Sequence, residues 1–356
     1  AAGRNPIAGI ACAYAGVTGG FSANLLPSAL DVLLVGFTQE AVDASRLLTG
    51  YHVQVLGNWY FLAASTPLLV IVTVWVTERI IEPRLGPWKS EEDHRLEAVS
   101  PVEKRGLAWA FASLVALVAL ALVLILPHGA PLREDGGATV IQRIRPFLDS
   151  MVVWVLLVFF VPGLVYGLVT RRVKSDHDVA KLTGDTMATM GSYIVLAFFA
   201  AQFLSYFAWS NLGAILAVTG ATTLKSLGLQ GAPLLVGFVL LAGFINLFIT
   251  SASAKWAIMA PIFVPMFVLL GFTPEATQAV FRVGDSVTNI ITPIFVYLPF
   301  IQTYMNRYDP KAGTGTILSL MLPYSIAYLP MWTLLLLVFH WLNWPLGPGV
   351  HIPLPH

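Results

Sequence analysis

The sequence has little charge. Its 20 lysines and arginines and 19 aspartates and glutamates make up 11% of 356 residues, whereas a soluble domain carries roughly 25%. Hydrophobic residues account for 57%. So few charges cannot cover the surface of a water-soluble chain of this length, and we infer that a lipid bilayer surrounds most of it. This scarcity excludes a soluble enzyme and a protein that binds nucleic acid.

Cysteine is also scarce, since Cys12 is the single one in the sequence. One cysteine excludes an intramolecular disulfide and a cysteine metal cluster. The seven histidines form no pair at metal-ligand spacing. We therefore expect no cofactor, and the only ion that we expect is a coupling Na⁺ or H⁺.

Long uncharged runs fill the rest of the chain. Five of them have 19 to 21 residues, close to the roughly 20 residues that cross a bilayer core. They are residues 59–77, 107–127, 150–170, 256–274 and 286–306. Longer uncharged runs hold further segments, at 5–30, 186–224, 226–254 and 312–356, the last with an apolar stretch at 318–343. No short alternating strands occur, so the sequence predicts an all-α polytopic membrane protein with about eight to ten inserted elements.

The loop charges predict orientation and organisation. Basic residues gather at 77–105 and 171–181, so both loops are expected in the cytoplasm and 128–147 outside. We expect a first repeat half at 1–76, a charged cytoplasmic linker at 77–105, connecting spans at 106–181, a second half at 182–311, and a C-terminal span and tail at 312–356.

The run at 186–224 has 39 residues, which is too few for two spans with a turn and too many for one. Its middle holds Ser205, Ser210, Asn211 and Gly213. Polar and small residues at this place favour a re-entrant hairpin, which a membrane tolerates where protein or water covers the backbone. The alternative is one long tilted span with an interfacial tail.

An internal repeat is indicated by Gly-Phe-Thr-Gln-Glu-Ala at 36–41 and Gly-Phe-Thr-Pro-Glu-Ala at 271–276. Each copy follows a polar cluster within an apolar run, at 19–24 and 250–254. Paired interruptions of this kind are typical of the binding site of a secondary transporter, whereas the alternative is small residues at close helix contacts. Only 21 residues precede Ser22, against about 65 from 186 to the second cluster. We therefore expect a matching hairpin and earlier spans to precede this chain.

Ionisable residues inside the membrane are functional candidates by default. Lys255 directly follows the second polar cluster, and Arg282 and Asp285 lie three residues apart at the entrance to 286–306. In the first half, Asp31 follows the first cluster, and a carboxylate there can bind Na⁺ or carry a proton. Asp43 is the alternative first-half carboxylate.

Uncharged polar residues accompany these charges. We predict a Na⁺ site near Asn24, Ser251 and Asp285, because exposed carbonyls and helix ends at such interruptions can hold a cation. Trp256 adjoins Lys255, where its indole can stack on an aromatic substrate. The residues predicted to couple an ion or proton are Asp31, Asp285, Ser22, Ser251, Ser253, Thr288 and Asn289.

The motifs Ser-Ala-Ser-Ala-Lys-Trp at 251–256 and Arg-Val-Gly-Asp at 282–285, with Gly-Phe-Ser-Ala-Asn at 20–24 and Pro-Leu-Gly-Pro-Gly at 345–349, resemble the AbgT family of p-aminobenzoyl-glutamate transporters. The resemblance extends from Ala8 to the end of the chain. It implies a homodimer in the bacterial inner membrane with an inverted repeat, re-entrant hairpins and broken transmembrane helices. The implied activity is ion-coupled movement of p-aminobenzoyl-glutamate or export of sulfonamide antimetabolites.

The resemblance also implies first-half site residues at Asn24 and Asp31. With the charge and ring chemistry of the substrate, it gives a set of expected substrate-binding residues: Asn24, Trp256, Lys255, Pro274, Arg282 and Pro293. Two other classes stay open on the residues alone. One is an ion channel, and the other is an intramembrane aspartyl protease using Asp31 and Asp285, although such proteases need Gly-x-Gly-Asp where this chain has Arg-Val-Gly-Asp.

Overall fold

The computed structural model describes residues 4–86, 99–136, 143–189, 209–293, 295 and 297–354, with a few single residues between 190 and 208. Within these residues the chain is helical, and extended backbone pairs only at two isolated bridges, Phe272 with Pro353 and Gly347 with Val350. The predicted all-α class is confirmed. The chain divides into two compact units, one of Ala1–His94 with Leu204–His356 and one of Arg95–Phe203.

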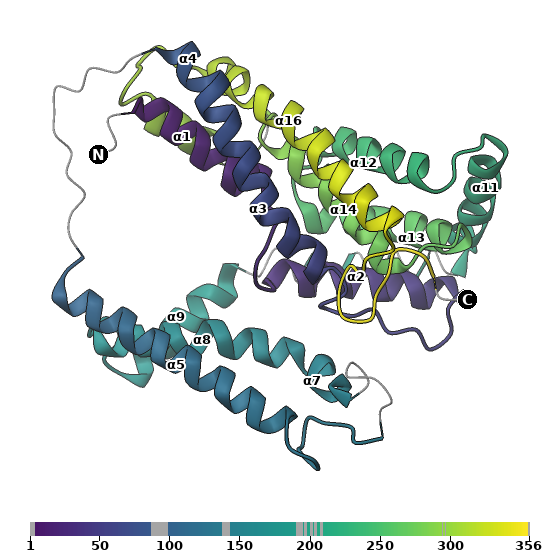
Figure 1. Cartoon of the computed structure of the whole chain (residues 1–356), viewed down its shortest axis with the longest axis horizontal. Helices are drawn as coiled ribbons and strands as arrows, with labels where there is room; N and C mark the ends of the chain where they lie inside the picture. The colour runs from purple at the N-terminus through teal and green to yellow at the C-terminus, as the bar shows by residue number, and fades with distance from the viewer. Residues whose placement is uncertain are drawn as a thin grey trace. The chain divides into compact units, whose positions relative to one another are not determined.

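The first unit contains the broken helices (Figure 1). Its elements are α1 (Pro6–Tyr14), the π-helix η1 (Ala15–Gly19), α2 (Ala29–Ser45), α3 (Trp59–Val76) with its continuations η2 (Thr77–Ile81) and α4 (Glu82–Leu85), α11 (Leu212–Ser226), α12 (Ala232–Asn246), α13 (Ala252–Leu269), α14 (Pro274–Asn289), α15 (Leu298–Met305) and α16 (Thr314–Trp341). The second unit contains α5 (Pro101–Ile125), α7 (Arg145–Asp149), α8 (Met151–Val169) and α9 (Asp176–Thr189), with α5 packed along α8.

Among the described residues, five helices are long and apolar enough to cross a bilayer: Trp59–Leu85, Pro101–Ile125, Met151–Val169, Ala252–Leu269 and Thr314–Trp341. Four of the five predicted spans coincide with them, and the fifth helix covers most of the apolar stretch predicted at 318–343. The run at 286–306 does not form the one continuous helix that its length suggests. There α14 ends at Asn289, a turn containing Pro293 follows, and α15 has only eight residues. Proline lacks the backbone N–H that a continuing helix needs, so an uncharged run alone does not specify a span.

Two other predicted segments differ from their description or lie partly outside the described residues. The charged linker predicted at 77–105 begins as helix, because α3 continues to Leu85, where Arg4 pairs with Glu78 at 2.8 Å. The rest of that segment at 87–98 is outside the described residues. Most of the centre of the predicted hairpin at 186–224, between α9 and α11, is also outside the described residues. The hairpin and the five-part division of the chain therefore stay predictions.

Two interruptions of helix occur where the polar clusters predicted them. The first break, residues 20–28, separates η1 from α2, and the second break, residues 247–251, separates α12 from α13. Ser28 and Ser251 are the N-cap residues that directly precede α2 and α13. The hexapeptides themselves do not correspond, because 36–41 lies inside α2 whereas 271–276 spans the turn before α14. The order helix, break, helix is what occurs twice.

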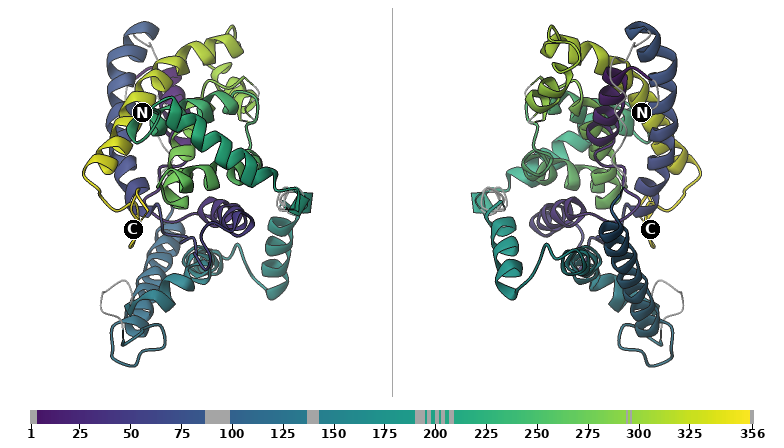
Figure 2. Two further views of the ribbon diagram at one scale, coloured as in Figure 1. Left: turned by 90° about the vertical axis from the view of Figure 1, so that its right-hand side faces the viewer. Right: turned by 90° about the vertical axis from the view of Figure 1, so that its left-hand side faces the viewer.

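Helix α14 is the buried centre of the first unit. Fifteen of its sixteen residues are buried, and it packs against α2, α12, α13 and α16 (Figure 2). The helix approaches α12 closely at Gly284, where an added Cβ would lie 2.3 Å from the carbonyl oxygen of Val239. Such close backbone approach through glycine is typical of helix contacts in membranes.

The C-terminal tail fixes the start of this helix. The N–H of Thr273 donates to the carbonyl of Ile352 at 3.0 Å, and the N–H of Leu354 donates to Gly271 at 2.9 Å. The same tail reaches α3, since Phe61 donates its N–H to Leu346 at 3.0 Å. The tail therefore joins the beginning of α14 to the beginning of α3.

We expect Gly284→Ala to lower stability by about 1–3 kcal/mol, because the added methyl group forces α14 away from α12. Thermal unfolding of the purified protein in detergent measures the change. Gly237→Ala is the matched control, since Gly237 lies on α12 with no atom within 4 Å of an added Cβ, and alanine favours helix over glycine. Equal melting temperatures for the two variants would contradict the close packing.

Candidate functional site

Two ion pairs meet α14 in its interior. Arg282 Nη1 donates to the carboxylate of Asp31, and Lys255 Nζ pairs with the carboxylate of Asp285. All four side chains are buried, with exposed fractions from 0% for Lys255 to 4% for Asp31. Arg282 and Asp285 are not at a helix end, although they directly precede the uncharged run at 286–306. They lie inside α14, and they bind two different helices, α2 and α13.

The Asp31 pair is connected to the first break. Asp31 is the third residue of α2, and its Oδ2 accepts from the N–H of Ser28 at 2.5 Å and from its hydroxyl at 2.8 Å. The amide of Asn24 donates to the same hydroxyl at 3.2 Å. The alternative carboxylate, Asp43, is exposed and accepts from Gln39. The geometry thus favours Asp31 as the first-half site residue, and its role stays a prediction.

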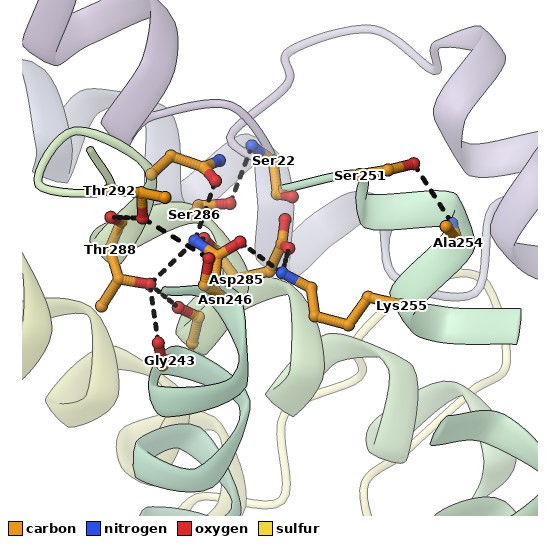
Figure 3. A network of polar contacts seen from close by, with 12 residues as sticks. Ser22, Gly243, Asn246, Ser251, Ala254, Lys255, Asp285, Ser286, Thr288 and Thr292 are labelled. Atoms are coloured by element: carbon orange, nitrogen blue, oxygen red, sulfur yellow. Dashed lines mark hydrogen bonds and ion pairs between the residues drawn. The ribbon is translucent and has the colours of Figure 1, made fainter. Parts of the chain in front are cut away.

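The Asp285 pair is held by Asn246, the last residue of α12 (Figure 3). The side-chain Oδ1 of Asn246 accepts from Lys255. Its Nδ2 lies 2.7 Å from the carbonyl oxygen of Asp285, 2.9 Å from the hydroxyl of Thr288 and 2.8 Å from Oδ1 of Asn289. The sequence prediction missed Asn246. The available signal was one amide residue within an apolar run, four residues before the second polar cluster.

The first break and the π-helix η1 before it also contact the C-terminal half of α14. The N–H of Ser22 donates to the hydroxyl of Ser286 at 3.2 Å, and Asn289 donates to the carbonyl of Thr18 at 3.4 Å. Predicted coupling residues from both halves, Ser22 and Asn289 among them, therefore lie around one end of α14. The third buried ionisable residue of α14 lies at its other end, where Glu275 accepts from the hydroxyl of Tyr51 at 2.7 Å.

The three residues of the predicted Na⁺ site belong to different groups. Asn24 binds within the Asp31 group, and Asp285 already has the ammonium of Lys255 as its cationic partner. Ser251 is exposed and caps α13 by accepting from the N–H of Ala254 at 3.3 Å, with the hydroxyl of Ser253 at 3.4 Å. The structure does not bring the three together as one ligand set, and a Na⁺ site near them stays a prediction.

Trp256 is enclosed. Its indole N–H donates to the hydroxyl of Thr38 at 2.9 Å, and its ring lies 4.6 Å from that of Phe281. With an exposed fraction of 0%, the ring has no accessible face for a substrate in this conformation. The two predicted prolines lie at opposite ends of α14, since Pro274 is buried at its first residue and Pro293 is exposed in the turn beyond it.

Arg282 has binding capacity that Asp31 does not use. Its Nε and Nη2 atoms are buried, and no acceptor among the described residues takes a hydrogen bond from them. Buried donors without partners are rare in folded proteins, and a guanidinium forms strong, directional bonds with carboxylates. Arg282 therefore keeps two donors for an anion, which can reach them only in another conformation, because the side chain is 1% exposed in this one.

The sequence model of the AbgT putative transporter family matches residues 1–354. The chain belongs to the AbgT family. The p-aminobenzoyl-glutamate transport protein of Escherichia coli K12 is 42% identical over 352 residues, which are 99% of this chain and 68% of that protein. The family assigns the chain to transporters rather than enzymes, and the predicted location as a multi-pass protein of the inner membrane is confirmed.

Two solved AbgT structures have the same fold. The YdaH transporter of Alcanivorax borkumensis superposes with a TM-score of 0.90 at 43% identity, covering 98% of this chain and 72% of that one. MtrF of Neisseria gonorrhoeae, described within a class of antimetabolite efflux pumps, gives 0.90 at 44% identity, covering 99% of this chain and 70% of that one. The aspartyl protease alternative is wrong, because the family transports and because Asp31 and Asp285 each pair with a separate cation.

We expect Lys255→Met to lower stability by about 3–5 kcal/mol, because it leaves the Asp285 carboxylate buried without its cation. The double variant Lys255→Met/Asp285→Asn should recover most of the loss, since no unpaired charge remains. Unfolding in detergent, analysed as a double-mutant cycle, measures the coupling. Arg4→Met removes an exposed pair instead and is expected to change little. A single variant as stable as the wild type would contradict the assignment.

Proposed function

We propose that this AbgT transporter moves p-aminobenzoyl-glutamate and sulfonamide antimetabolites across the membrane by alternating access, driven by an H⁺ or Na⁺ gradient. The named activities of its relatives support the substrate class. The single observation that carries the proposal is the pair of buried ion pairs on α14, one to each helix that follows a break. Ion-paired residues beside broken helices at membrane depth are typical of carrier sites.

The unpaired donors of Arg282 support an anionic substrate. p-Aminobenzoyl-glutamate has two carboxylates, and either one complements the free Nε and Nη2 atoms. Sulfonamides share the aminophenyl ring but lack the glutamate. We therefore propose that Arg282 contributes more to the affinity for p-aminobenzoyl-glutamate than to the affinity for sulfonamides.

The pair of Lys255 and Asp285 supports ion coupling. A cation or proton that binds the Asp285 carboxylate competes with the ammonium of Lys255, which the amide of Asn246 also holds. Loss of this pair loosens α13 from α14, and a ligand shifts a conformational equilibrium only through such a difference between states. We propose Asp285 as the principal coupling residue and Asp31 as the second candidate.

We also propose that the transporter is a homodimer in the lipid bilayer. Helix α5 supports this, because Gly106 is its only buried residue although the whole helix is apolar enough to span. Such a surface needs lipid or a second copy against it. Native mass spectrometry in detergent measures the state, and we expect two copies, whereas a monomer at all concentrations would contradict this proposal.

Uptake by proteoliposomes tests the transport proposal. We expect uptake of p-aminobenzoyl-glutamate under an imposed Na⁺ or pH gradient to saturate with concentration and to collapse when an ionophore dissipates that gradient. Asp285→Asn should reduce gradient-driven uptake to the level of protein-free liposomes, because the carboxylate no longer binds the ion. Asp43→Asn, at an exposed carboxylate, is the control and should retain uptake.

Two outcomes would contradict this proposal. Unchanged gradient-driven uptake by Asp285→Asn would exclude that residue from coupling. Flux that rises without saturation and persists as passive conductance would instead favour the channel.

A further inference from the structure

Glu275 is a buried acid whose binding partners are neutral. It is the second residue of α14 and is 1% exposed. Its Oε2 accepts from the hydroxyl of Tyr51 at 2.7 Å, and its Oε1 accepts from the N–H of Gln54 at 3.1 Å. Among the described residues, no lysine, arginine or histidine forms an ion pair with it. Glu275 therefore differs from Asp31 and Asp285, which each have a cation.

The titratable groups on the elements around Glu275 do not supply the missing cation. Lys255 of α13 pairs with Asp285, the ring of His351 in the tail lies 3.0 Å from the carbonyl oxygen of Asn343, and α12 and η1 carry no charged residue. A carboxyl group buried without a cation costs free energy when it is ionised, and a proton removes that cost. The other groups pair elsewhere, pack against a ring or are exposed: Asp31 of α2 with Arg282, His340 of α16 against Phe272, and the exposed Glu40, Asp43, Arg46 and His52.

Tyr51 connects Glu275 with the polar surface of the first unit. It lies in the segment between α2 and α3, where Gln39 donates to its backbone carbonyl at 2.9 Å. Tyr51 is half-buried, whereas charged and polar residues close to it in the sequence are exposed, namely Glu40, Asp43, Arg46 and His52. Exposed charges indicate water rather than lipid at this surface. One hydroxyl group therefore lies between this surface and the buried carboxyl group.

Gln54 offers an acceptor that suits the protonated form of Glu275. Its side-chain Oε1 is buried, and no donor among the described residues bonds to it. Its backbone N–H already binds Glu275, and the same segment packs closely on this side chain, since an added Cβ at Gly57 would lie 2.6 Å from Cγ of Glu275. Buried acceptors without a donor are rare in folded proteins. A proton on Glu275 would add a donor beside this acceptor.

We propose that Glu275 is a second proton-binding residue of the transporter, loaded through Tyr51 and separate from the pair of Lys255 and Asp285. The hydroxyl proton of Tyr51 passes to Oε2 of Glu275, and the tyrosine oxygen takes a proton from a hydronium ion, which becomes water. The carboxylate thereby becomes a neutral carboxylic acid, and the tyrosine is unchanged.

The inference rests on the proposed function and names a residue through which a pH gradient acts on α14. Glu275 and Asp285 are ten residues apart on this helix, which corresponds to about 15 Å along its axis. A proton at Glu275 and an ion at Asp285 would therefore act at opposite ends of the same buried helix.

The competing interpretation is structural. An acidic residue in the first turn of a helix favours the helix through its dipole, and Glu275 also holds the segment between α2 and α3. That role predicts lower thermal stability when Glu275 is replaced, but no change in the response of transport to pH. Glu40 provides the matched comparison, because it occupies the same place in the hexapeptide at 36–41 and is exposed.

Uptake of p-aminobenzoyl-glutamate by proteoliposomes that contain the full chain tests the coupling. We expect wild-type uptake to rise with an imposed pH gradient, and Glu275→Gln to lose this rise because glutamine cannot carry the proton. Tyr51→Phe should lose part of it, because phenylalanine has no hydroxyl to pass a proton on, and Glu40→Gln should match the wild type. Under a Na⁺ gradient at constant pH, Glu275→Gln should also match the wild type.

Infrared difference spectra of the detergent-purified protein, recorded between acidic and alkaline buffer, test proton binding without transport. We expect a carbonyl band of a protonated carboxyl group that is absent from Glu275→Gln and present in Glu40→Gln. The band should shift in Tyr51→Phe, because the carboxyl group loses a hydrogen-bond partner there.

A pH response that is absent from the wild type or survives Glu275→Gln would overturn the inference, and so would spectra in which Glu275→Gln loses no band. If Glu275→Gln does not fold, Tyr51→Phe decides, since an unchanged band or an unchanged pH response in that variant contradicts the proposal. If the wild type takes up no p-aminobenzoyl-glutamate, the proposed function fails on its own. The spectra then test proton binding at Glu275 separately, by the same criteria.

Discussion

The charges of α14 constrain the rest of the first unit, because a polar helix is stable at the centre of a membrane protein only when its charged groups find partners. Arg282 and Asp285 find theirs in Asp31 and Lys255, each on a helix that begins directly after a break. Removing any one partner leaves a buried charge, so the two breaks, α2, α13 and α14 are bound into one arrangement.

This arrangement places the candidate functions on one helix. Arg282 faces an acidic residue from the first half and keeps donors for an anion, while Asp285 faces a basic residue from the second half. The two residues are three apart, so they move together whenever α14 moves as a rigid helix. A substrate at Arg282 and an ion at Asp285 would therefore act on the same element without a longer route between them.

The sequence predicted the membrane class and most of the spans because lipid contact selects for uncharged residues, which are countable. It also singled out the four residues of the buried ion pairs, because ionisable residues are rare in such runs. These are Asp31, Lys255, Arg282 and Asp285. It failed where three-dimensional contact decides. The run at 286–306 is uncharged yet broken, and Asn246 has no periodic signature. The enclosure of Trp256 depends on Thr38, which is more than two hundred residues away.

The least predictable helix is the most buried one, and the reason is physical. Hydropathy identifies long apolar helices, such as α5, which buries almost nothing. A helix surrounded by protein does not need an apolar surface all round. It needs small residues for close approach and polar residues for pairing. Gly284 and Asp285 meet these two needs side by side, one against α12 and the other toward α13. In this chain, polar content within an apolar region therefore marks the buried interior, and the candidate site lies where the apolar pattern is weakest.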